Sequence, residues 1–474
     1  MNFVDMILFH AAADAERPAF VTMPQVITFR MLADGVAAAE ARIAAAGIGP
    51  RDVVGIVVGN PIHHATLILA LQRLGVVSVS FPSHAAAAKP RLGMPAILVE
   101  ETKPAKAPFR QIAVGPDWFR EPPAAPAARH AFAEDEACRI FLSSGTTGQP
   151  RPVWLTPSAI ASRMVAHTLA MAAGSWDRML CTLGLGSAWG FCAIMAALWG
   201  GKTVCLARTP DEALRMIALF RADLLIASIH QLRTMLEIHR RSPHHCATLR
   251  QINTGGSTFP RELVWEAQQK FCSRIVLIYG STETGTAAFA LANRLGSVEG
   301  ATGLVAPWAR IEAVDAAQAP LPPGTEGVLR VRTPNHGRWH ESEHDRGEPR
   351  DWEWFYPGDH GFVGADGLVV ITGRASEIIN VGGVKLSPER IERALLSHPH
   401  VRDVAVAGVP GAGGIEEIRA AVVPWRAIEE EALIAWCAER MPNTPPRRLR
   451  IVESIPRNEN GKILRQQVRD MLAD

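Results

Sequence analysis

The amino-acid sequence predicts an α/β fold, in which helices cover largely parallel sheets, followed by a smaller α+β unit. The first observation is a repeated alternation of buried-strand runs with helical stretches, which is typical of parallel strands joined by crossover helices. The second is a change of pattern beyond Arg374, where this alternation stops. Near the start of the chain we expect helix, strand, helix and strand at residues 28–46, 53–58, 65–74 and 76–81.

A long uncharged segment at residues 181–201 has the length needed to cross a bilayer. Its five glycines instead favour a strand end, a loop and one buried helix from about Trp189 to Trp199, so we expect no membrane span. Further along, an apolar run predicts a buried strand at residues 275–278, and residues 361–371 resemble a hairpin. Two stretches without periodicity, residues 103–129 and 334–354, are expected to be surface connections.

The chain length and the change of pattern predict two domains. With 474 residues the chain exceeds what one hydrophobic core normally holds. After Arg374, Ser387 followed by Pro388 is typical of a helix N-cap with proline in the first turn. We therefore expect a large N-terminal domain at residues 1–374, a small C-terminal domain at 377–474 and a hinge near 375–377.

Composition favours a cytoplasmic protein with a small-molecule substrate. Charged residues make up 20% of the chain and the net charge is +2, which provides no long-range field for nucleic acid. The seven cysteines are odd in number and form no Cys-x-x-Cys pair, as expected of reduced core residues in a cytosolic protein. The N-terminus shows no cleavage-like segment after a basic start, so no secretion signal is expected.

The most informative segment is a loop rich in serine, threonine and glycine, Phe141-Leu-Ser-Ser-Gly-Thr-Thr-Gly-Gln-Pro-Arg151, directly after a strand-like run. Glycines let the backbone approach phosphate oxygens, hydroxyls and free N–H groups donate hydrogen bonds, and a cation completes the site. The ending of a Walker A loop is missing, and by itself the pattern is equally typical of a solvated turn. The candidate phosphate-binding residues are Ser143, Ser144, Gly145, Thr146, Thr147, Gly148 and Arg151.

Four further motifs follow in order: Tyr279-Gly-Ser-Thr-Glu283, Tyr356-Pro-Gly-Asp359, Gly373-Arg374 and Asn460-Gly-Lys462. Taken singly, each is more typical of a turn, a packed ring or a solvated charge than of a functional site. In this order, from about residue 27 to 466, they resemble the adenylate-forming superfamily of acyl- and aryl-CoA synthetases, peptide-synthetase adenylation domains and luciferases. The resemblance indicates adenylation of a carboxylic acid and says little about which acid.

The resemblance also implies a fold and a set of roles. The large domain would end in a small β-barrel-like part, the C-terminal domain would be a mobile lid, and the enzyme would use ATP and Mg²⁺. Glu283 would bind the metal, Thr282 would meet the α-phosphate, and Lys462 would reach the acid and the α-phosphate from the lid. The resemblance also implies that Tyr279, Gly256 and Ser257 contact the base, and that Gly280 and Ser281 belong to the nucleotide site. Asp359 would bind the ribose, and Arg374 would bind ribose or phosphate.

In the resembled family the uncharged segment lines the acid pocket. No acidic residue lies between Asp177 and Asp211, so a buried α-ammonium would stay unpaired at a high cost. We therefore expect an aryl acid or a short-to-medium aliphatic acid without an α-amino group. The candidate pocket residues are Ser187, Trp189, Phe191, Cys192, Asn253 and Thr254.

The family's second half-reaction transfers the acyl group to a thiol, either of CoA or of the phosphopantetheine of an acyl carrier protein. Gly382, Gly383 and Lys385 match the lid segment that borders the thiol channel, and Ser376 stands at the hinge. The arginines at 447, 448 and 450 suit a phosphate-bearing partner of either kind, and we favour CoA. In the phosphate loop, Arg151-Pro152 replaces the usual Lys-Gly, which predicts a stiffer loop.

The sequence is less consistent with two other classes of protein. A serine hydrolase would need a Gly-x-Ser-x-Gly elbow, which does not occur around Ser144, Ser187, Ser257 or Ser281. A catalytically silent homologue that only binds nucleotide or acyl groups is disfavoured because Glu283, Asp359, Arg374 and Lys462 are all retained. Release of pyrophosphate from ATP across a panel of carboxylic acids separates these readings.

Overall fold

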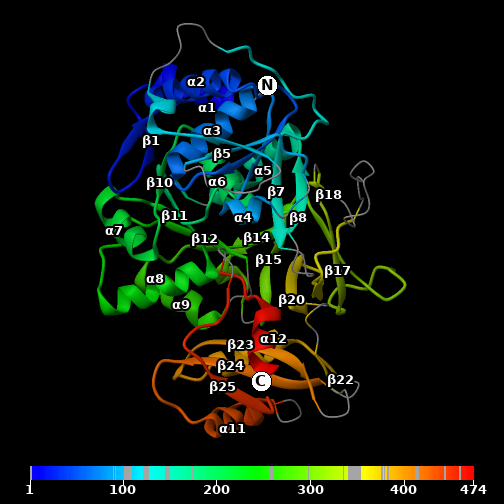
Figure 1. The fold of residues 1–474 in the computed structure, drawn as a ribbon. Helices are drawn as coiled ribbons and strands as arrows, with labels where there is room; N and C mark the ends of the chain where they lie inside the picture. Colours follow the sequence, from blue (N-terminus) through cyan, green and yellow to red (C-terminus); the bar gives the residue numbers. More distant parts are fainter. Residues whose placement is uncertain are drawn as a thin grey trace.

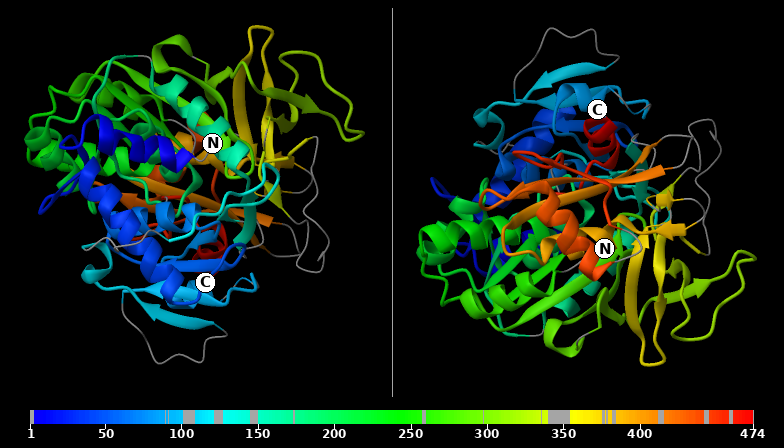
Figure 2. Two further views of the ribbon diagram at one scale, coloured as in Figure 1. Left: turned by 90° about the horizontal axis from the view of Figure 1, so that it is seen from above. Right: turned by 90° about the horizontal axis from the view of Figure 1, so that it is seen from below.

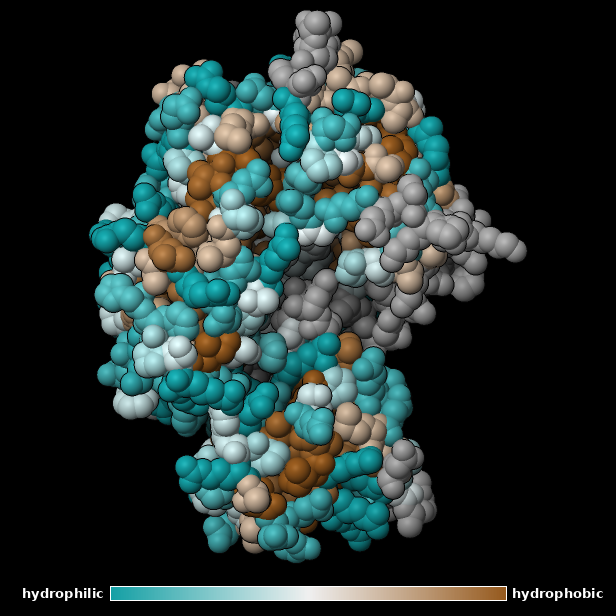
Figure 3. Space-filling view, turned by 60° about the vertical axis from the view of Figure 1, so that its left-hand side comes forward, coloured by the Kyte–Doolittle hydropathy of each residue, from teal (hydrophilic) through white to brown (hydrophobic). Residues whose placement is uncertain are grey.

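The structure is a computed structural model that describes residues 3–88, 90, 92–100, 109–120, 127–144, 150–172, 174–256, 260–296, 298–334, 336–339, 354–374, 377, 379–381, 384–411, 416–441, 445–457 and 461–473. Within these residues the fold is α/β, as the sequence predicts, with a large N-terminal body and a smaller C-terminal body (Figure 1). Figure 3 shows the smaller body as a separate lobe joined to the large body at a constriction.

The first sheet of the large body has the strand order β18-β8-β7-β4-β3-β5-β6, and its strand pairs are parallel except for the two that include β8. Strand β8 runs antiparallel to β7 and pairs Arg151 with Ser143, so the two ends of the candidate phosphate loop lie side by side. The strands are β3 (Val53–Val57), β4 (Val77–Ser80), β5 (Ala96–Val99), β6 (Arg110–Ala113), β7 (Arg139–Ser144), β8 (Pro150–Leu155) and β18 (Arg338–Trp339).

The second sheet has the order β16-β17-β19-β20-β15-β14-β13-β12-β11-β9-β10-β1-β2 among the described strands. Strand β13 is parallel to β12 but antiparallel to β14, so the sheet changes from parallel to antiparallel at β13. Its strands are β1 (Pro18–Val21), β2 (Val26–Thr28), β9 (Arg178–Cys181), β10 (Thr203–Leu206), β11 (Leu224–Ser228), β12 (Gln251–Gly255), β13 (Ile275–Ser281), β14 (Gly285–Leu291), β15 (Ala301–Val305), β16 (Arg310–Val314), β17 (Gly327–Arg332), β19 (Asp359–Val363) and β20 (Leu368–Arg374).

The antiparallel extension, formed by β14 to β17 with β19 and β20, has a small apolar core of its own, which includes Ala288, Leu329 and Val369. This extension occupies the part of the chain where the resemblance implies a barrel-like unit, and it continues the large sheet. Strands β19 and β20 form the expected hairpin and place Asp359 opposite Arg374. Two of the motif residues are therefore neighbours across one strand pair.

Helices cover both sheets and fill the space between them (Figures 1 and 2). The uncharged segment forms α6, whose residues are buried on nearly all sides in a core that also holds side chains of both sheets. This packing explains its apolar character, and no helix among the described residues has the length and hydropathy to span a bilayer. The helices are α1 (Phe3–Ala13), α2 (Phe29–Ala45), α3 (Pro61–Arg73), α4 (His84–Ala87), α5 (Pro157–Met171), α6 (Ala188–Trp199), α7 (Pro210–Phe220), α8 (Ile229–Arg241), α9 (Arg261–Lys270), and the 3₁₀ turns η1 (Pro116–Phe119) and η2 (Ala292–Arg294).

The C-terminal body is an α+β unit with its own apolar core. Helix α10 packs against β23 in one cluster, and α12 covers the same strands in another. Its elements are β21 (Ile379–Val381), β22 (Val384–Leu386), α10 (Pro388–Leu396), β23 (Val401–Pro410), β24 (Glu416–Pro424), α11 (Glu430–Arg440), β25 (Arg448–Ile451) and α12 (Arg465–Ala473). The expected hinge residue Ser376 lies outside the described residues.

Three local expectations differ from the structure. Helix α3 begins at Pro61 rather than 65, because the Asn60 side chain accepts from Ile62 N at 2.9 Å and caps the helix. The stretch 103–129 was expected to be a plain connection, yet residues 110–113 form β6, an edge strand whose short sequence has no alternation. Ser387 precedes α10 but makes no capping bond, because its hydroxyl donates to the Glu389 carboxylate instead.

Candidate active site

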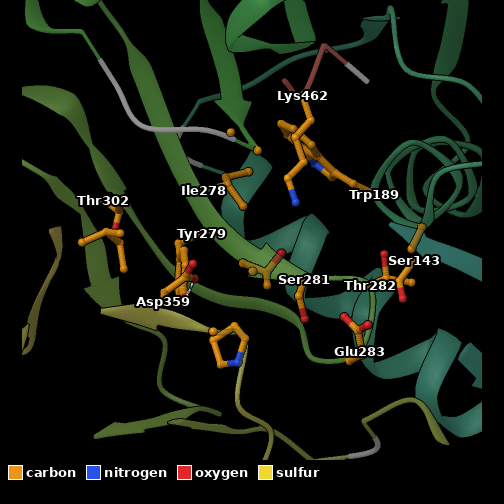
Figure 4. Close-up of a pocket in the computed structure, with 18 of the residues that line it drawn as sticks. Ser143, Trp189, Ile278, Tyr279, Ser281, Thr282, Glu283, Thr302, Asp359 and Lys462 are labelled. Atoms are coloured by element: carbon orange, nitrogen blue, oxygen red, sulfur yellow. Dashed lines mark hydrogen bonds between the residues drawn. The ribbon is translucent and has the colours of Figure 1, made fainter. Parts of the chain in front are cut away.

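A cavity of about 610 Å³ lies where the end of β13, the start of α6 and the C-terminal body meet (Figure 4). Its volume is in the range usual for small-molecule sites. Residues from motifs that are far apart in the sequence line it together. The predicted site residues that line this cavity are Ser143, Arg151, Ser187, Trp189, Cys192, Gly256, Tyr279, Gly280, Ser281, Thr282, Glu283, Asp359, Arg374 and Lys462.

At one end of the cavity, Asp359 is held by two partners. The Tyr279 hydroxyl donates to its Oδ2 at 2.8 Å, and Arg374 Nε lies 3.2 Å from its Oδ1. Burial and the neighbouring Asp359 raise the pKa of Tyr279 well above its ordinary value, so the phenol keeps its proton and acts as the donor. Asp359 itself is 5% exposed and reaches the cavity through this small opening. A carboxylate in this position can accept from two vicinal hydroxyls.

At the other end, the turn after β13 presents Thr282 and Glu283, and Figure 4 shows their side chains at the same end of the cavity as Ser143. The main chain of this turn is fixed from α5 by Arg163, which is 5% exposed. Its guanidinium donates to Thr282 O at 2.8 Å and to Glu283 O at 2.7 Å. Because the carbonyls are bound, the two side chains remain directed to the cavity.

Arg163 was not among the residues predicted from the sequence. The signal for it was present, because a single arginine interrupts the otherwise apolar middle of the stretch 157–171. Four residues further on, His167 also lines the cavity and is almost fully buried. Burial, together with the charge of Arg163, lowers the pKa of His167 to about 4, so its imidazole is neutral near pH 7.

Lys462 enters the cavity from the C-terminal body, beside Trp189 (Figure 4). Burial, and next the charge of Arg374, lower the pKa of Lys462 to about 8, while Glu377, Asp359 and Glu283 oppose this shift. The ammonium is thus partly desolvated and surrounded by the carboxylates of the site. The structure consequently shows the lid in a position where its lysine and the large domain share one cavity.

A charged cluster of the C-terminal body borders the same cavity and was also missed from the sequence. Arg465 Nε lies 2.7 Å from Glu377, and the same guanidinium pairs with Glu392 and lies 3.7 Å from Glu389. Burial, and next the charge of Glu392, raise the pKa of Glu389 to about 7. Nothing in the sequence connects these four residues except their position at or after the expected hinge.

The acid end of the cavity lies around Trp189, with Leu183, Cys192 and Ile278 as apolar neighbours. A Cβ on Gly255 would lie 3.3 Å from the Trp189 ring and 2.5 Å from Ile278 O, so glycine is required there for the wall to close. The Trp189 Nε1 is buried and makes no hydrogen bond within the described part of the chain. This N–H is thus a polar group available at this end, and the neutral His167 of α5 also lines the cavity.

Three residues expected in the acid pocket lie behind its wall. Phe191 is fully buried and its ring packs 5.4 Å from that of Phe141. Asn253 and Thr254 are buried within β12, and the next residues, Gly255 and Gly256, line the cavity in their place. The remaining predicted site residues lie outside the described residues, or their side chains do: Ser144, Gly145, Thr146, Thr147, Gly148, Ser257, Gly382, Gly383 and Lys385.

The residues present suit a nucleotide and one hard cation. Hydroxyls of Ser143 and Thr282 and the cations Arg151 and Lys462 line the phosphate side of the cavity. Among the described residues there is no group of three or more His, Cys, Asp or Glu side chains that could hold a metal by themselves. Magnesium typically takes one or two carboxylates and completes its shell with water and phosphate oxygens, and Glu283 can supply such a carboxylate.

A two-body protein whose smaller body delivers a lysine into a nucleotide-type cavity of the larger one is the arrangement of an adenylate-forming enzyme. The chain belongs to the AMP-binding enzyme family. That family matches residues 9–338, and the AMP-binding enzyme C-terminal domain matches residues 390–462.

The relatives of the chain include acid–thiol ligases. It is 29% identical over 340 residues to the medium-chain fatty-acid–CoA ligase of Escherichia coli (strain K12). This alignment covers 69% of this chain and 60% of the relative. The chain is 27% identical over 504 residues to the fatty acid–[acyl-carrier-protein] ligase ScoC of Streptomyces coeruleorubidus, covering 99% and 96% of the two chains. In structure it resembles the o-succinylbenzoate CoA synthetase (MenE) of Bacillus subtilis, with a TM-score of 0.86, 24% identity and 98% of each chain covered, which confirms the fold.

Proposed function

We propose that this enzyme uses ATP and Mg²⁺ to activate a carboxylic acid as its acyl-adenylate, and then transfers the acyl group to a thiol. The observation that carries the proposal is the meeting of Lys462 from the lid with Glu283 and Asp359 from the large domain in one cavity. The cation reaches this nucleotide-type cavity from the second domain and not from the domain that forms most of its wall. It suits a reaction in which negative charge develops on a phosphorus centre.

In the first half-reaction, a carboxylate oxygen of the acid bonds to the α-phosphorus of ATP while the bond from that phosphorus to the pyrophosphate oxygen breaks. Charge spreads over the phosphoryl oxygens, and Lys462 would screen it from the lid side. Asp359 would fix the ribose, with Tyr279 and Arg374 fixing Asp359 in turn. Glu283 would hold Mg²⁺, which when bound neutralises the charge of the departing phosphates.

The acid is proposed to lack an α-amino group and to be an aryl acid or a short-to-medium aliphatic acid. At the acid end, Trp189 and Ile278 offer apolar surface. The buried cation Arg163, which lines the cavity beside the Thr282–Glu283 turn, would repel an ammonium group. The free Trp189 N–H and the neutral His167 can bind a hydrogen-bonding substituent. Of the described carboxylates that line the cavity, Glu283 and Asp359 are assigned to Mg²⁺ and ribose, and Glu377 and Glu392 pair with Arg465, so none of these four is offered to the ammonium of an amino acid.

The thiol acceptor is proposed to be CoA. The alternative acceptor is an acyl carrier protein, and it is supported by a relative that aligns over nearly the full length of both chains, a fatty acid–[acyl-carrier-protein] ligase. Competition assays with CoA and with a phosphopantetheinylated carrier protein would decide between the two acceptors. Both acceptors present the same thiol arm, so the first half-reaction does not depend on this choice.

The test of the proposal is pyrophosphate release from ATP and Mg²⁺ across a panel of carboxylic acids. We expect release with selected aryl or short-to-medium aliphatic acids, and no release with the corresponding α-amino acids. Acyl-adenylate formation should be confirmed by mass spectrometry before a thiol is added. A purified, folded protein that releases pyrophosphate with no acid of the panel would overturn the proposal.

Glu283→Gln is expected to lower Mg²⁺-dependent turnover about 100-fold and to raise the Mg²⁺ concentration needed for half-maximal rate, because a neutral amide is a poorer ligand for a hard cation. Among the described residues, Arg163 and the Gly337 N–H donate to the main-chain carbonyl of Glu283, which the substitution leaves in place, so folding should be preserved. A magnesium titration of the rate measures both effects. An unchanged rate and magnesium requirement would make Glu283 a structural residue.

The pKa of Lys462 predicts a pH dependence with a definite sign. Since burial lowers this pKa to about 8, the free enzyme loses the lysine charge as the pH rises through that value. We expect kcat/KM for ATP to fall about tenfold per pH unit above it, because kcat/KM reports groups of the free enzyme. Lys462→Arg, which keeps its charge, should be slower but should lose this decline. If kcat/KM for ATP declines in the same way in Lys462→Arg, a group other than Lys462 causes the decline.

A further inference from the structure

We propose that Arg233 of α8 and Asp403 of β23 form a clamp between the two bodies that positions Lys462 for adenylation. This inference rests on the function proposed above. It concerns residues remote from the cavity, since neither Arg233 nor Asp403 lines it. Arg233 is therefore a positioning residue, and it acts on the reaction through the loop that carries the lysine.

The clamp is a chain of contacts that ends next to Lys462. Arg233 Nη1 lies 3.1 Å from Asp403 Oδ1, and both side chains are largely buried, with 18% and 14% exposed. The same carboxylate accepts from Arg457 Nη2 at 2.8 and 3.0 Å. Arg457 in turn donates from Nη1 to Gly461 O at 2.7 Å. Because Gly461 precedes Lys462, the large domain is connected to the lysine through two arginines and one carboxylate.

A second contact places the lysine loop directly on α8. Gly461 has a φ of +77°, and a Cβ built on it would lie only 2.5 Å from the Cβ of His230. Glycine is thus required both by the backbone conformation and by the close approach. His230 lies one helical turn before Arg233, so the two contacts come from the same face of α8.

This face of α8 continues the contact with the lid along its length. Glu237 lies 3.6 Å from Arg402, and Trp425 lies beneath Arg240 and Arg402, at 5.6 and 5.8 Å. Residues 230, 233, 237 and 240 follow the helical period and form one stripe. Figure 2, seen from below, shows the orange and red C-terminal elements across the green region that contains α8. One helix face thus carries the whole series of contacts.

The two arginines that hold Asp403 have different consequences. Arg457 belongs to the same body as Asp403, so this pair moves with the lid as a unit. Arg233 belongs to the large domain, and its contact is lost when the lid turns. A contact made in one lid position shifts the population toward that position and leaves the chemistry of the other position unaffected. The clamp should therefore favour the first half-reaction over the second.

The test is Arg233→Ala, assayed separately in the two half-reactions. We expect adenylate formation to be about tenfold slower, through kcat rather than the KM for ATP or acid, because the loss of one partly buried ion pair reduces the competent population by this order. Thioester formation from supplied acyl-adenylate should be unchanged. Arg233→Lys, which keeps the charge, should recover part of the rate.

The matched control is Arg215→Ala, because Arg215 forms its ion pair, at 3.0 Å, with Asp211 of its own helix α7. It should leave both half-reactions unchanged. Equal losses in both half-reactions of Arg233→Ala, or no loss in adenylation, would overturn the clamp. If the wild-type protein activates no acid, the proposed function is wrong, but the clamp can still be tested by amide hydrogen exchange. Faster exchange at Gly461 and Lys462 in Arg233→Ala supports it, and unchanged exchange refutes it.

Discussion

Lys462→Ala is expected to slow adenylate formation about a thousandfold, since this lysine is the lid's cation at the site of developing phosphoryl charge. Thiol transfer from supplied acyl-adenylate should be retained, because the cation is needed only in the lid position that forms the adenylate. The environment of the lysine supports a large effect. Its ammonium is desolvated enough to lower its pKa to about 8, and in such surroundings a positioned charge acts more strongly than in water.

Acid-dependent pyrophosphate exchange and single-turnover thioester formation measure the two steps. Lys202→Ala is a suitable control, because Lys202 lies in the large domain 3.5 Å from Asp177 and away from the cavity. It should change neither step. Near-normal adenylation by Lys462→Ala would remove this residue from the proposed mechanism, and equal loss of thiol transfer would show that it serves both steps.

Much of the fold could be predicted because the relevant patterns are local. The alternation of apolar runs located β3 and β4, and the hairpin pattern located β19 and β20. The motif order predicted the residues that meet in the cavity, although the cavity itself depends on strand order. Asp359 and Arg374, for example, are brought together by a strand pairing.

The three residues that were expected in the acid pocket and do not line the cavity share a physical cause. In β12 both faces of the sheet are covered, so Asn253 and Thr254 are buried whichever way they point, and the chain reaches the cavity at Gly255 and Gly256. Phe191 lies in α6, which is buried nearly all round, so helical period could not tell its cavity face from its core face. Knowing that the segment lines a pocket did not identify which side chains do so.

The residues missed altogether act across long sequence distances. Arg163 bonds to Glu283 across 120 residues and Arg233 to Asp403 across 170. Such contacts depend on how α5 packs on the second sheet and how the lid rests on α8, and neither leaves a periodic pattern. The Arg163 contact could have been suspected, because Arg163 is the only charged residue in a mostly apolar helix. The Arg233–Asp403 contact could not, because it depends on the relative position of the two bodies.

Asp359→Ala is expected to raise the KM for ATP about 100-fold, which corresponds to the loss of two hydrogen bonds from ribose hydroxyls to a charged group. The variant also leaves the Tyr279 hydroxyl and Arg374 without their shared partner, so a lower melting temperature is expected as well. Tyr279→Phe is the matched control for this second effect. It removes one bond to Asp359 but keeps the carboxylate in the cavity.

Nucleotide analogues separate ribose recognition from structural support. The wild-type enzyme should prefer ATP to 2′-deoxy-ATP, and Tyr279→Phe should keep most of this preference because the acceptor is still present. Asp359→Ala should use both nucleotides equally poorly, since the group that distinguishes them is gone. If Asp359→Ala retains the full preference for ATP while its melting temperature falls as in Tyr279→Phe, the carboxylate only ties β13 to the β19–β20 hairpin, and another group must bind the ribose.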